Sequence, residues 1–280
     1  LWERDCSVQR RNQKVVERAP APYLSAAQRE QLCQLGKKIC KHVNYECAGT
    51  VEFLMDMDSG KFYFIEVNPR VQVEHTVTEE VTGIDIVRAQ ILISEGKSLV
   101  EATGCASQYH VQLDGHALQC RVTTADPQNN FIPDYGRIQM YRSATGPGIR
   151  LDGGTAYSGA VITRFYDSLL TKVTARAPTP EMAIARMDRA LREFRIRGVS
   201  TNIAFVENLL KHPTFLNNEY HTKFIDETPS LFDFKKRRDR ATKILTYIAD
   251  ITVNGHPETA GRAKPAADIK APRPPVKPTT

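Results

Sequence analysis

The sequence has no long hydrophobic run and no closely spaced pair of cysteines. Its apolar stretches all fall short of the roughly 20 residues that a helix needs to cross a bilayer, so no membrane partner is expected. No disulfide or zinc framework is expected either, because no Cys-x-x-Cys pair is present. We interpret the six cysteines as reduced thiols of a reducing compartment: Cys6, Cys33, Cys40, Cys47, Cys105 and Cys120.

The chain carries an excess of positive charge, but its pattern does not indicate nucleic-acid binding. The formal net charge is +6, and basic residues gather in the run 235–240. Asp239 interrupts this run and no aromatic residues are interleaved for base stacking, so it is interpreted as a solvated face. The 280 residues, 41% of them hydrophobic, suffice for one or two cores. After Gly255 the chain becomes rich in proline and alanine, which predicts a linker.

Local patterns predict several helices and a small sheet. A Ser-x-x-Gln capping box begins a predicted helix over 25–44. Apolar spacing and start signals predict further helices over 84–94, over 180–194 and after residue 201 or 202. Short alternating runs with glycine and proline predict a small sheet within 115–173.

Two short apolar strands, 50–56 and 62–68, flank a turn, and each carries one glutamate. A register symmetric about Ser59 places Glu52 directly opposite Glu66. The same register predicts an apolar core face of Val51 with Val67, Phe53 with Ile65 and Met55 with Tyr63, and sets Leu54 opposite Phe64 on the glutamate face.

Opposed carboxylates on an apolar hairpin repel each other and resist desolvation. A cation between them, or a proton held by one of them, removes this conflict. The neighbouring donors are oxygen atoms, with Asn68 two residues beyond Glu66, which favours magnesium or manganese over zinc. The alternative is a register slipped by one residue, which leaves one glutamate in solvent.

The segment after the second strand carries a guanidinium, an amide and a carboxylate at spacing two. Arg70, Gln72 and Glu74 would project to one side of an extended segment. An arginine grips a planar oxyanion through two hydrogen bonds, and a neighbouring carboxylate accepts its proton. This set predicts a site for a small acid such as bicarbonate beside a metal-bound phosphate. Pro69 favours an active-site loop or an edge, and an exposed polar edge strand is the other interpretation.

Four motifs resemble, in order and spacing, the biotin carboxylase component of biotin-dependent carboxylases: residues 6–14, 49–53, 64–75 and 166–172. The resemblance covers residues 1–230. Within the family the chain is most similar to pyruvate carboxylases, through residues 76–80, 120–124, 198–205 and 243–255. A carboxylase acting on an acyl-coenzyme A and a non-catalytic truncated product are the alternatives.

The resemblance implies an α+β fold with three parts: residues 1–105 as the C-terminal part of an ATP-grasp domain, 106–230 as the biotin carboxylase C-terminal domain, and 231–280 as a junction and linker. It implies an enzyme in which MgATP phosphorylates bicarbonate to carboxyphosphate, and the carbon dioxide released carboxylates biotin for transfer to pyruvate. Biotin would be carried on a domain outside this chain, and the full-length enzyme would be a homo-oligomer.

Motif position also implies roles for single residues. The metal ions would be held by Glu52, Glu66 and Asn68. Bicarbonate would be bound by Lys14, Arg70, Gln72 and the backbone of Val73, with Glu74 as the base that deprotonates it. Arg121 would stabilise the enolate-like form of biotin, because an arginine cannot itself lose its proton. ATP would contact Gln9 and Asn12 through its ribose and Leu54 through adenine. Asn12 replaces the histidine often found there, and its amide can still hydrogen-bond a hydroxyl.

A further set of residues matches positions implicated in the acetyl-coenzyme A response of pyruvate carboxylases: Arg195, Arg197, Arg237, Asp239 and Arg240. Plain ion pairing near a domain junction is the alternative. The sequence shows neither a glycine-rich lid for the ATP phosphates nor an Ala-Met-Lys-Met biotin attachment site, and it begins at Leu1. We therefore expect an internal piece of a longer enzyme, inactive alone, from the bacterial cytoplasm or the mitochondrial matrix, with the cytoplasm preferred.

Overall fold

The computed structural model describes residues 1–154, 156–234, 240–256 and 258, and it divides into two compact units. The first unit is Leu1–Phe234, and the second is Lys235–Thr280, in which helix α8 (Arg240–Asn254) is described. The basic run at 235–239 and most of the predicted linker lie outside the described residues. No helix within the described ranges is long and apolar enough to span a membrane.

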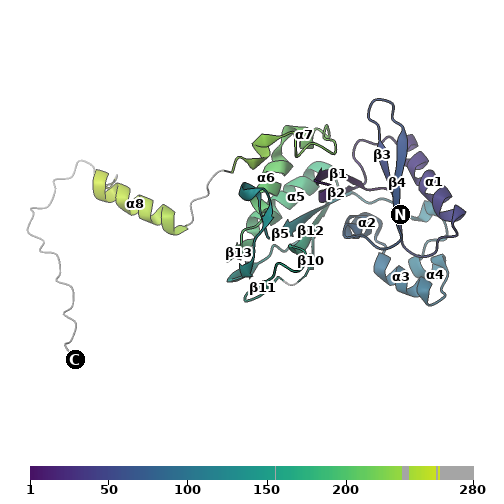
Figure 1. Ribbon diagram of the computed structural model, residues 1–280, viewed down its shortest axis with the longest axis horizontal. Coiled ribbons are helices and arrows are strands. Elements are labelled where there is room, and N and C mark those ends of the chain that lie inside the picture. The colour runs from purple at the N-terminus through teal and green to yellow at the C-terminus, as the bar shows by residue number, and fades with distance from the viewer. Residues whose placement is uncertain (155, 235–239, 257, 259–280) are drawn as a thin grey trace, which may run out of the picture. The chain divides into compact units, whose positions relative to one another are not determined.

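The first unit mixes helices and strands, as the expected α+β class requires (Figure 1). Its helices are α1 (Ala26–His42), α2 (His75–Thr82), α3 (Ile86–Ser94), α4 (Leu99–Thr103), α5 (Pro180–Glu193), α6 (Ile203–Lys211) and α7 (Pro213–Leu216). Its strands are β1 (Asp5–Arg10), β2 (Gln13–Ala19), β3 (Thr50–Met55), β4 (Phe62–Asn68), β5 (His116–Thr123), β6 (Ala125–Asp126), β7 (Ile132–Pro133), β8 (Gly136–Arg137), β9 (Met140–Arg142), β10 (Ile149–Gly153), β11 (Val161–Ile162), β12 (Leu169–Ala177) and β13 (Arg195–Arg197).

Five strands form one antiparallel sheet in the order β1-β2-β5-β12-β10. The sheet is wider than the small sheet predicted within 115–173, because β2 pairs with β5 and brings β1 with it. The other strands form two-stranded ladders: β3 with β4, β6 with β7, β8 with β11, and β9 with β13.

Side chains along β5 alternate between the two faces of this sheet, and the two sets differ in polarity. Leu118 and Cys120 are buried in the main core together with Met187 of α5. The intervening residues face α2 instead, where Ala117 packs with Val77 and Gln119 hydrogen-bonds Thr76. Figure 1 shows α2 and α5 on opposite sides of the sheet. The α2 side is therefore the polar face, and it carries the candidate site.

The predicted helices over 25–44, 84–94 and 180–194 are confirmed as α1, α3 and α5. Ser25 forms the expected capping box with Gln28 at the start of α1. The helix predicted after residue 201 or 202 is α6, with Asn202 at its N-cap position. These elements are specified by local caps and apolar spacing, so the sequence alone was enough to predict them.

The β3–β4 hairpin confirms half of its predicted register. Glu52 lies opposite Glu66, but a shift follows, and the next pairs are Phe53 with Phe64, Leu54 with Tyr63 and Met55 with Phe62. An extra residue in β4, Ile65, produces this bulge. The predicted apolar core face is wrong as well: Tyr63 and Ile65, which were assigned to it, are each 54% exposed.

Candidate active site

Lys14 lies at the centre of a group of charged side chains from β2, β3 and the loop before α2. Its Nζ is 2.7 Å from Oε1 of Glu52 and 2.7 Å from Oε1 of Glu74. Burial alone would lower the pKa of Lys14, but hydrogen bonds to the two carboxylates raise it above its ordinary value. Lys14 is therefore a fixed positive charge that joins the hairpin to the loop.

The tight turn between β1 and β2 brings Lys14 into this position, opposite Gln9. Arg11 and Asn12 form the turn with φ of 48° and 62°, in the left-handed region. Asparagine is among the residues that tolerate this conformation best, and it is favoured in two-residue hairpin turns. The backbone thus gives Asn12 a structural reason of its own, and its side chain is exposed.

The carboxylates of the two facing glutamates, Glu52 and Glu66, both contact the side-chain amide of Asn68. The Nδ2 atom of Asn68 lies 3.2 Å from Oε1 of Glu52 and 2.8 Å from Oε1 of Glu66. With its amide reversed, Asn68 would add a third oxygen to the two carboxylates. Magnesium is commonly held by one or two carboxylates together with substrate phosphates. Two carboxylates and one amide oxygen therefore fit an ion shared with a nucleotide, and among the described residues no group of three or more His, Cys, Asp or Glu side chains gathers to hold a metal on its own.

Gln72 is held between the hairpin and the first residues of the chain. Its Nε2 donates to Oε1 of Glu52 at 2.7 Å, and its Oε1 accepts from Nη2 of Arg4 at 2.7 Å. Arg4 also donates to Oγ1 of Thr50 at 3.1 Å. Sequence reasoning missed Arg4, because its partners are far away in the sequence.

Arg70 does not join this group. The spacing of two predicted that it would converge with Gln72 and Glu74, but it is exposed and its Nη1 donates to the carbonyl of Val71 at 3.2 Å. The segment is a loop with turns rather than an extended strand, as the contact between the backbone N–H of His75 and the Gln72 carbonyl shows. Side-chain alternation therefore fails for Arg70, whereas Gln72 and Glu74 are both buried.

Glu74 is the carboxylate most enclosed by positive charge. It is 2% exposed, with Lys14 on Oε1 and Nη2 of Arg121 3.2 Å from Oε2. Burial pushes the pKa of Glu74 up, but the hydrogen bond and charge of Lys14 outweigh it and hold that pKa below its ordinary value. Glu74 is thus ionised at neutral pH, as a general base must be.

Arg121 also contacts a second buried carboxylate, Glu17, which the sequence did not indicate. Nε of Arg121 donates to Oε1 of Glu17 at 2.7 Å, and Nε2 of Gln119 donates to Oε2 at 3.1 Å. Glu17 is fully buried, and this burial raises its pKa. Gln119 could have been found by strand alternation, since it lies two residues before Arg121 in β5.

The remaining predicted site residues of the first unit lie on β1, on β3 and in the loop before α2. Gln9 is half-buried on β1, and Leu54 is 49% exposed on β3. The carbonyl of Val73 accepts a hydrogen bond from Lys172 of β12 at 3.1 Å. Lys172 is a further residue that belongs to a recognised motif but had no predicted role.

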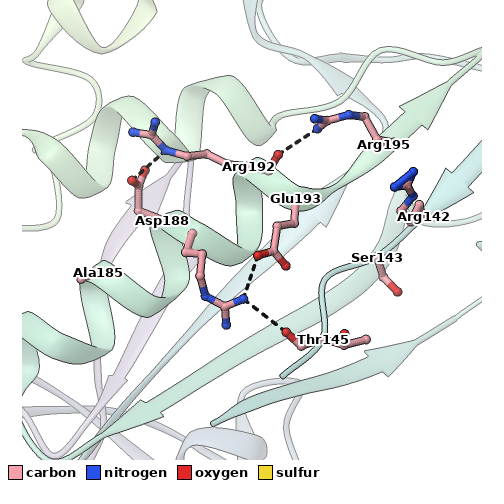
Figure 2. A pocket seen from close by; sticks show the side chains of 9 residues that line it. Arg142, Ser143, Thr145, Ala185, Asp188, Arg192, Glu193 and Arg195 are labelled. Atoms are coloured by element: carbon pink, nitrogen blue, oxygen red, sulfur yellow. Dashed lines mark hydrogen bonds and ion pairs between the residues drawn. The ribbon is translucent and has the colours of Figure 1, made fainter. Parts of the chain in front are cut away.

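A separate pocket of about 780 Å³ lies beside α5, next to β9 and β13 (Figure 2). Its charged lining consists of Arg142, Asp188, Arg189, Arg192, Glu193 and Arg195. Arg192 pairs with Asp188 at 2.8 Å, and Arg189 pairs with Glu193 at 2.8 Å. Within the part of the chain that the structure describes, the Arg195 side chain donates to the backbone carbonyls of Arg192 and Phe194.

The side chain of Arg142 forms no hydrogen bond or ion pair with the described residues, so the pocket carries positive charge that its own acids do not neutralise. Of the other predicted regulatory residues, Arg197 is exposed on β13 and does not line the pocket. Arg237 and Asp239 lie outside the described residues, as does the side chain of Arg240.

Two family models match the chain. The family model described as "Carbamoyl-phosphate synthase L chain, ATP binding domain" matches residues 1–102, and the one described as "Biotin carboxylase C-terminal domain" matches residues 119–227. The chain is 55% identical over 269 residues to the pyruvate carboxylase of Bacillus subtilis, which covers 96% of this chain and 23% of that protein. It therefore spans less than a quarter of the length of this relative.

Two solved structures are similar over most of the chain. The Rhizobium etli pyruvate carboxylase T882A with the allosteric activator acetyl coenzyme-A has a TM-score of 0.84 and 65% identity, covering 100% of this chain and 28% of that chain. The biotin carboxylase domain of the Hydrogenobacter thermophilus 2-oxoglutarate carboxylase, in complex with MgADP, ADP and bicarbonate, has a TM-score of 0.79 and 42% identity, covering 83% of this chain and 50% of that chain.

Proposed function

The chain belongs to the biotin carboxylases and corresponds to the C-terminal part of the biotin carboxylase component of pyruvate carboxylases, and on that premise we propose that it serves the biotin-carboxylating half-reaction of such an enzyme. MgATP phosphorylates bicarbonate, and the carbon dioxide released from carboxyphosphate carboxylates biotin. The biotin arrives on a carrier domain and passes the carboxyl group to pyruvate, giving oxaloacetate. The pyruvate carboxylase relatives favour pyruvate over an acyl-coenzyme A as the acceptor.

The observation that carries this proposal is the ionised, buried carboxylate of Glu74 between Lys14 and Arg121. Bicarbonate bound beside Lys14 would have its negative charge neutralised and its proton within reach of Glu74. Loss of that proton makes the bicarbonate oxygen a better nucleophile toward the terminal phosphorus of ATP. Arg70, now turned to the Val71 carbonyl, would swing toward bicarbonate to complete its binding.

Magnesium, or manganese, neutralises the phosphate charge when it is bound. Glu52 and Glu66 would supply its carboxylate oxygens, with Asn68 as a third ligand. Gln9 and Leu54 would contact the nucleotide. Lys14 already pairs with Oε1 of Glu52, so Lys14 and the metal ion would share this carboxylate when the ion is bound.

The direct test is Glu74→Gln in the complete enzyme that carries this chain. The amide keeps the shape of the carboxyl group but cannot accept the bicarbonate proton, so bicarbonate-dependent ATP cleavage should fall by about a hundredfold or more. Nucleotide binding, measured separately by titration, should remain nearly intact, because Glu74 lies on the loop and not on the nucleotide-binding hairpin.

Glu227→Gln is the matched control, since Glu227 is an exposed carboxylate that pairs only with His221 in this structure. It should leave ATP cleavage unchanged. Turnover retained by Glu74→Gln would exclude Glu74 as the base and would remove the main support of the proposed reaction.

The pocket beside α5 supports a second role, as part of the acetyl-coenzyme A response. The unneutralised Arg142 and the adjacent Arg195 suit a ligand rich in phosphate. In the complete enzyme, Arg142→Ala should raise the acetyl-coenzyme A concentration needed for half-maximal activation, and Arg88→Ala, an exposed arginine on α3, serves as its control. An activation curve unchanged by Arg142→Ala would contradict this role. Homo-oligomeric assembly and a cytoplasmic location are further parts of the proposed function.

A further inference from the structure

Lys172, on the five-stranded sheet, contacts both sequence neighbours of Glu74, which are Val73 and His75. It lies on β12, where it pairs with Arg121 of β5 and with Asp152 of β10. Its Nζ donates to the carbonyl of Val73 at 3.1 Å and lies 3.4 Å from Nε2 of His75. One side chain therefore fixes the backbone before the base and the ring after it.

These contacts are unlike those of Lys14. Lys14 is paired with two carboxylates, whereas Lys172 forms no ion pair within the described part of the chain, and its two contacts are a carbonyl and an imidazole. Burial accordingly lowers the pKa of Lys172. A half-buried lysine without a counter-ion is costly, so its place here, with a carbonyl and an imidazole as its contacts, points to a role at the loop rather than to ion pairing.

The imidazole of His75 continues this support into α2. Its Nε2 faces the Lys172 amine and must accept, which leaves the proton on Nδ1, 3.1 Å from Oε2 of Glu79. Arg150 holds the same Glu79 oxygen at 2.7 Å, and the other oxygen accepts from the backbone N–H of Ile86 at the start of α3. The His75 ring thus lies between the Lys172 amine and the Glu79 carboxylate, although its buried Nδ1 makes no hydrogen bond of good geometry with the described residues.

We propose that Lys172 is a positioning residue for the bicarbonate half of the site. It holds Val73 and His75 so that the carboxylate of Glu74 between them faces Lys14 and Arg121. This inference rests on the proposed function for its kinetic consequence. The loop that Lys172 holds also carries Gln72 and the Val73 backbone, the proposed bicarbonate contacts. Gln72 in turn donates to Glu52, but among the described residues Lys172 itself has no side-chain hydrogen bond or ion pair with the proposed metal ligands Glu52, Glu66 and Asn68.

The test compares Lys172→Met, Lys172→Arg and the control Lys97→Met in the complete enzyme. Methionine keeps the length of the side chain but removes the donor, so the KM for bicarbonate should rise about tenfold or more, as expected for loss of a charge-assisted hydrogen bond. The KM for MgATP should stay within about twofold. Lys172→Arg, which can still donate to the Val73 carbonyl, should recover part of the loss. Lys97 is exposed on the surface, and its variant should behave as the wild type.

A second readout keeps the inference independent of activity. Amide hydrogen exchange at residues 73–76 should accelerate in Lys172→Met, while exchange in β5 and β12 stays slow. An unchanged bicarbonate KM with unchanged exchange at 73–76 would overturn the inference. Equal losses for bicarbonate and MgATP, with faster exchange throughout the sheet, would also overturn it, because they indicate general destabilisation. If the wild type itself shows no bicarbonate-dependent ATP cleavage, the proposed function fails, and hydrogen exchange alone still decides whether Lys172 holds the loop.

Discussion

Glu17 shows how a residue remote from any expected substrate contact can set the geometry of the site. Oε1 of Glu17 is 2.7 Å from Nε and 2.6 Å from Nη2 of Arg121, and that same Nη2 also reaches Glu74 at 3.2 Å. Arg121 is therefore shared between a fully buried carboxylate and the proposed base. Removing one partner of such a group leaves the other charge less compensated in a buried environment.

Glu17→Gln should accordingly lower the turnover of biotin carboxylation by about tenfold, because Arg121 loses a charge-assisted hydrogen bond and shifts toward Glu74. It should leave the KM for MgATP unchanged, since Glu17 touches neither strand of the β3–β4 hairpin. Steady-state kinetics with free biotin or the carrier domain measure both quantities. Full turnover in Glu17→Gln would show that Arg121 does not need its ion pair with Glu17 to function.

At the scale of secondary-structure elements, Glu79 joins α2, α3 and β10. It accepts from the N–H of Ile86 at 2.8 Å, and it lies 2.7 Å from Arg150 of β10 and 3.1 Å from Nδ1 of His75. Burial opposes ionisation, but these three partners prevail and lower the pKa of Glu79 to about 2. Since the folded-state pKa lies below the ordinary value of 4.5, the stabilisation is complete above about pH 4.5 and is lost as the pH falls toward 2.

Glu79→Gln should therefore destabilise the protein by about 1 to 2 kcal/mol at pH 7 and by less at pH 3. Urea unfolding of the wild type and the variant at both pH values measures the two differences. Glu193→Gln is a suitable control, because Glu193 forms an exposed ion pair with Arg189 on α5. A difference between wild type and Glu79→Gln that does not change with pH would contradict the proposed ionisation of Glu79.

The elements that could be predicted from the sequence are those whose signals are local. The capping box of α1, the start of α5 and the Glu52–Glu66 pairing each depend on residues close together in the chain. The bulge at Ile65 escaped prediction, because no turn or alternation signal marks it. Arg4, Glu17 and Lys172 escaped prediction because their partners in the site are 46 to 104 positions away in the sequence.

At the scale of the whole molecule, the five-stranded sheet of the first unit has the candidate active site on one face and the main hydrophobic core on the other. The α2 face carries Arg121, which contacts the proposed base Glu74, while the facing carboxylates stand on the separate β3–β4 ladder. The α5 face packs the main core, and α5 in turn borders the arginine pocket. The chain spans less than a quarter of the length of the Bacillus subtilis relative, so we propose that both faces serve a larger enzyme.

The central claim is that bicarbonate, not water, attacks the terminal phosphorus of ATP at the Glu74 site. The most direct measurement supplies the complete enzyme with MgATP and bicarbonate labelled with a heavy oxygen isotope, and then determines the mass of the phosphate released. The attacking oxygen joins phosphorus, and the carbon–oxygen bond breaks when carbon dioxide leaves. We therefore expect one labelled oxygen in each phosphate formed. Unlabelled phosphate would mean that water is the nucleophile and would contradict attack by bicarbonate.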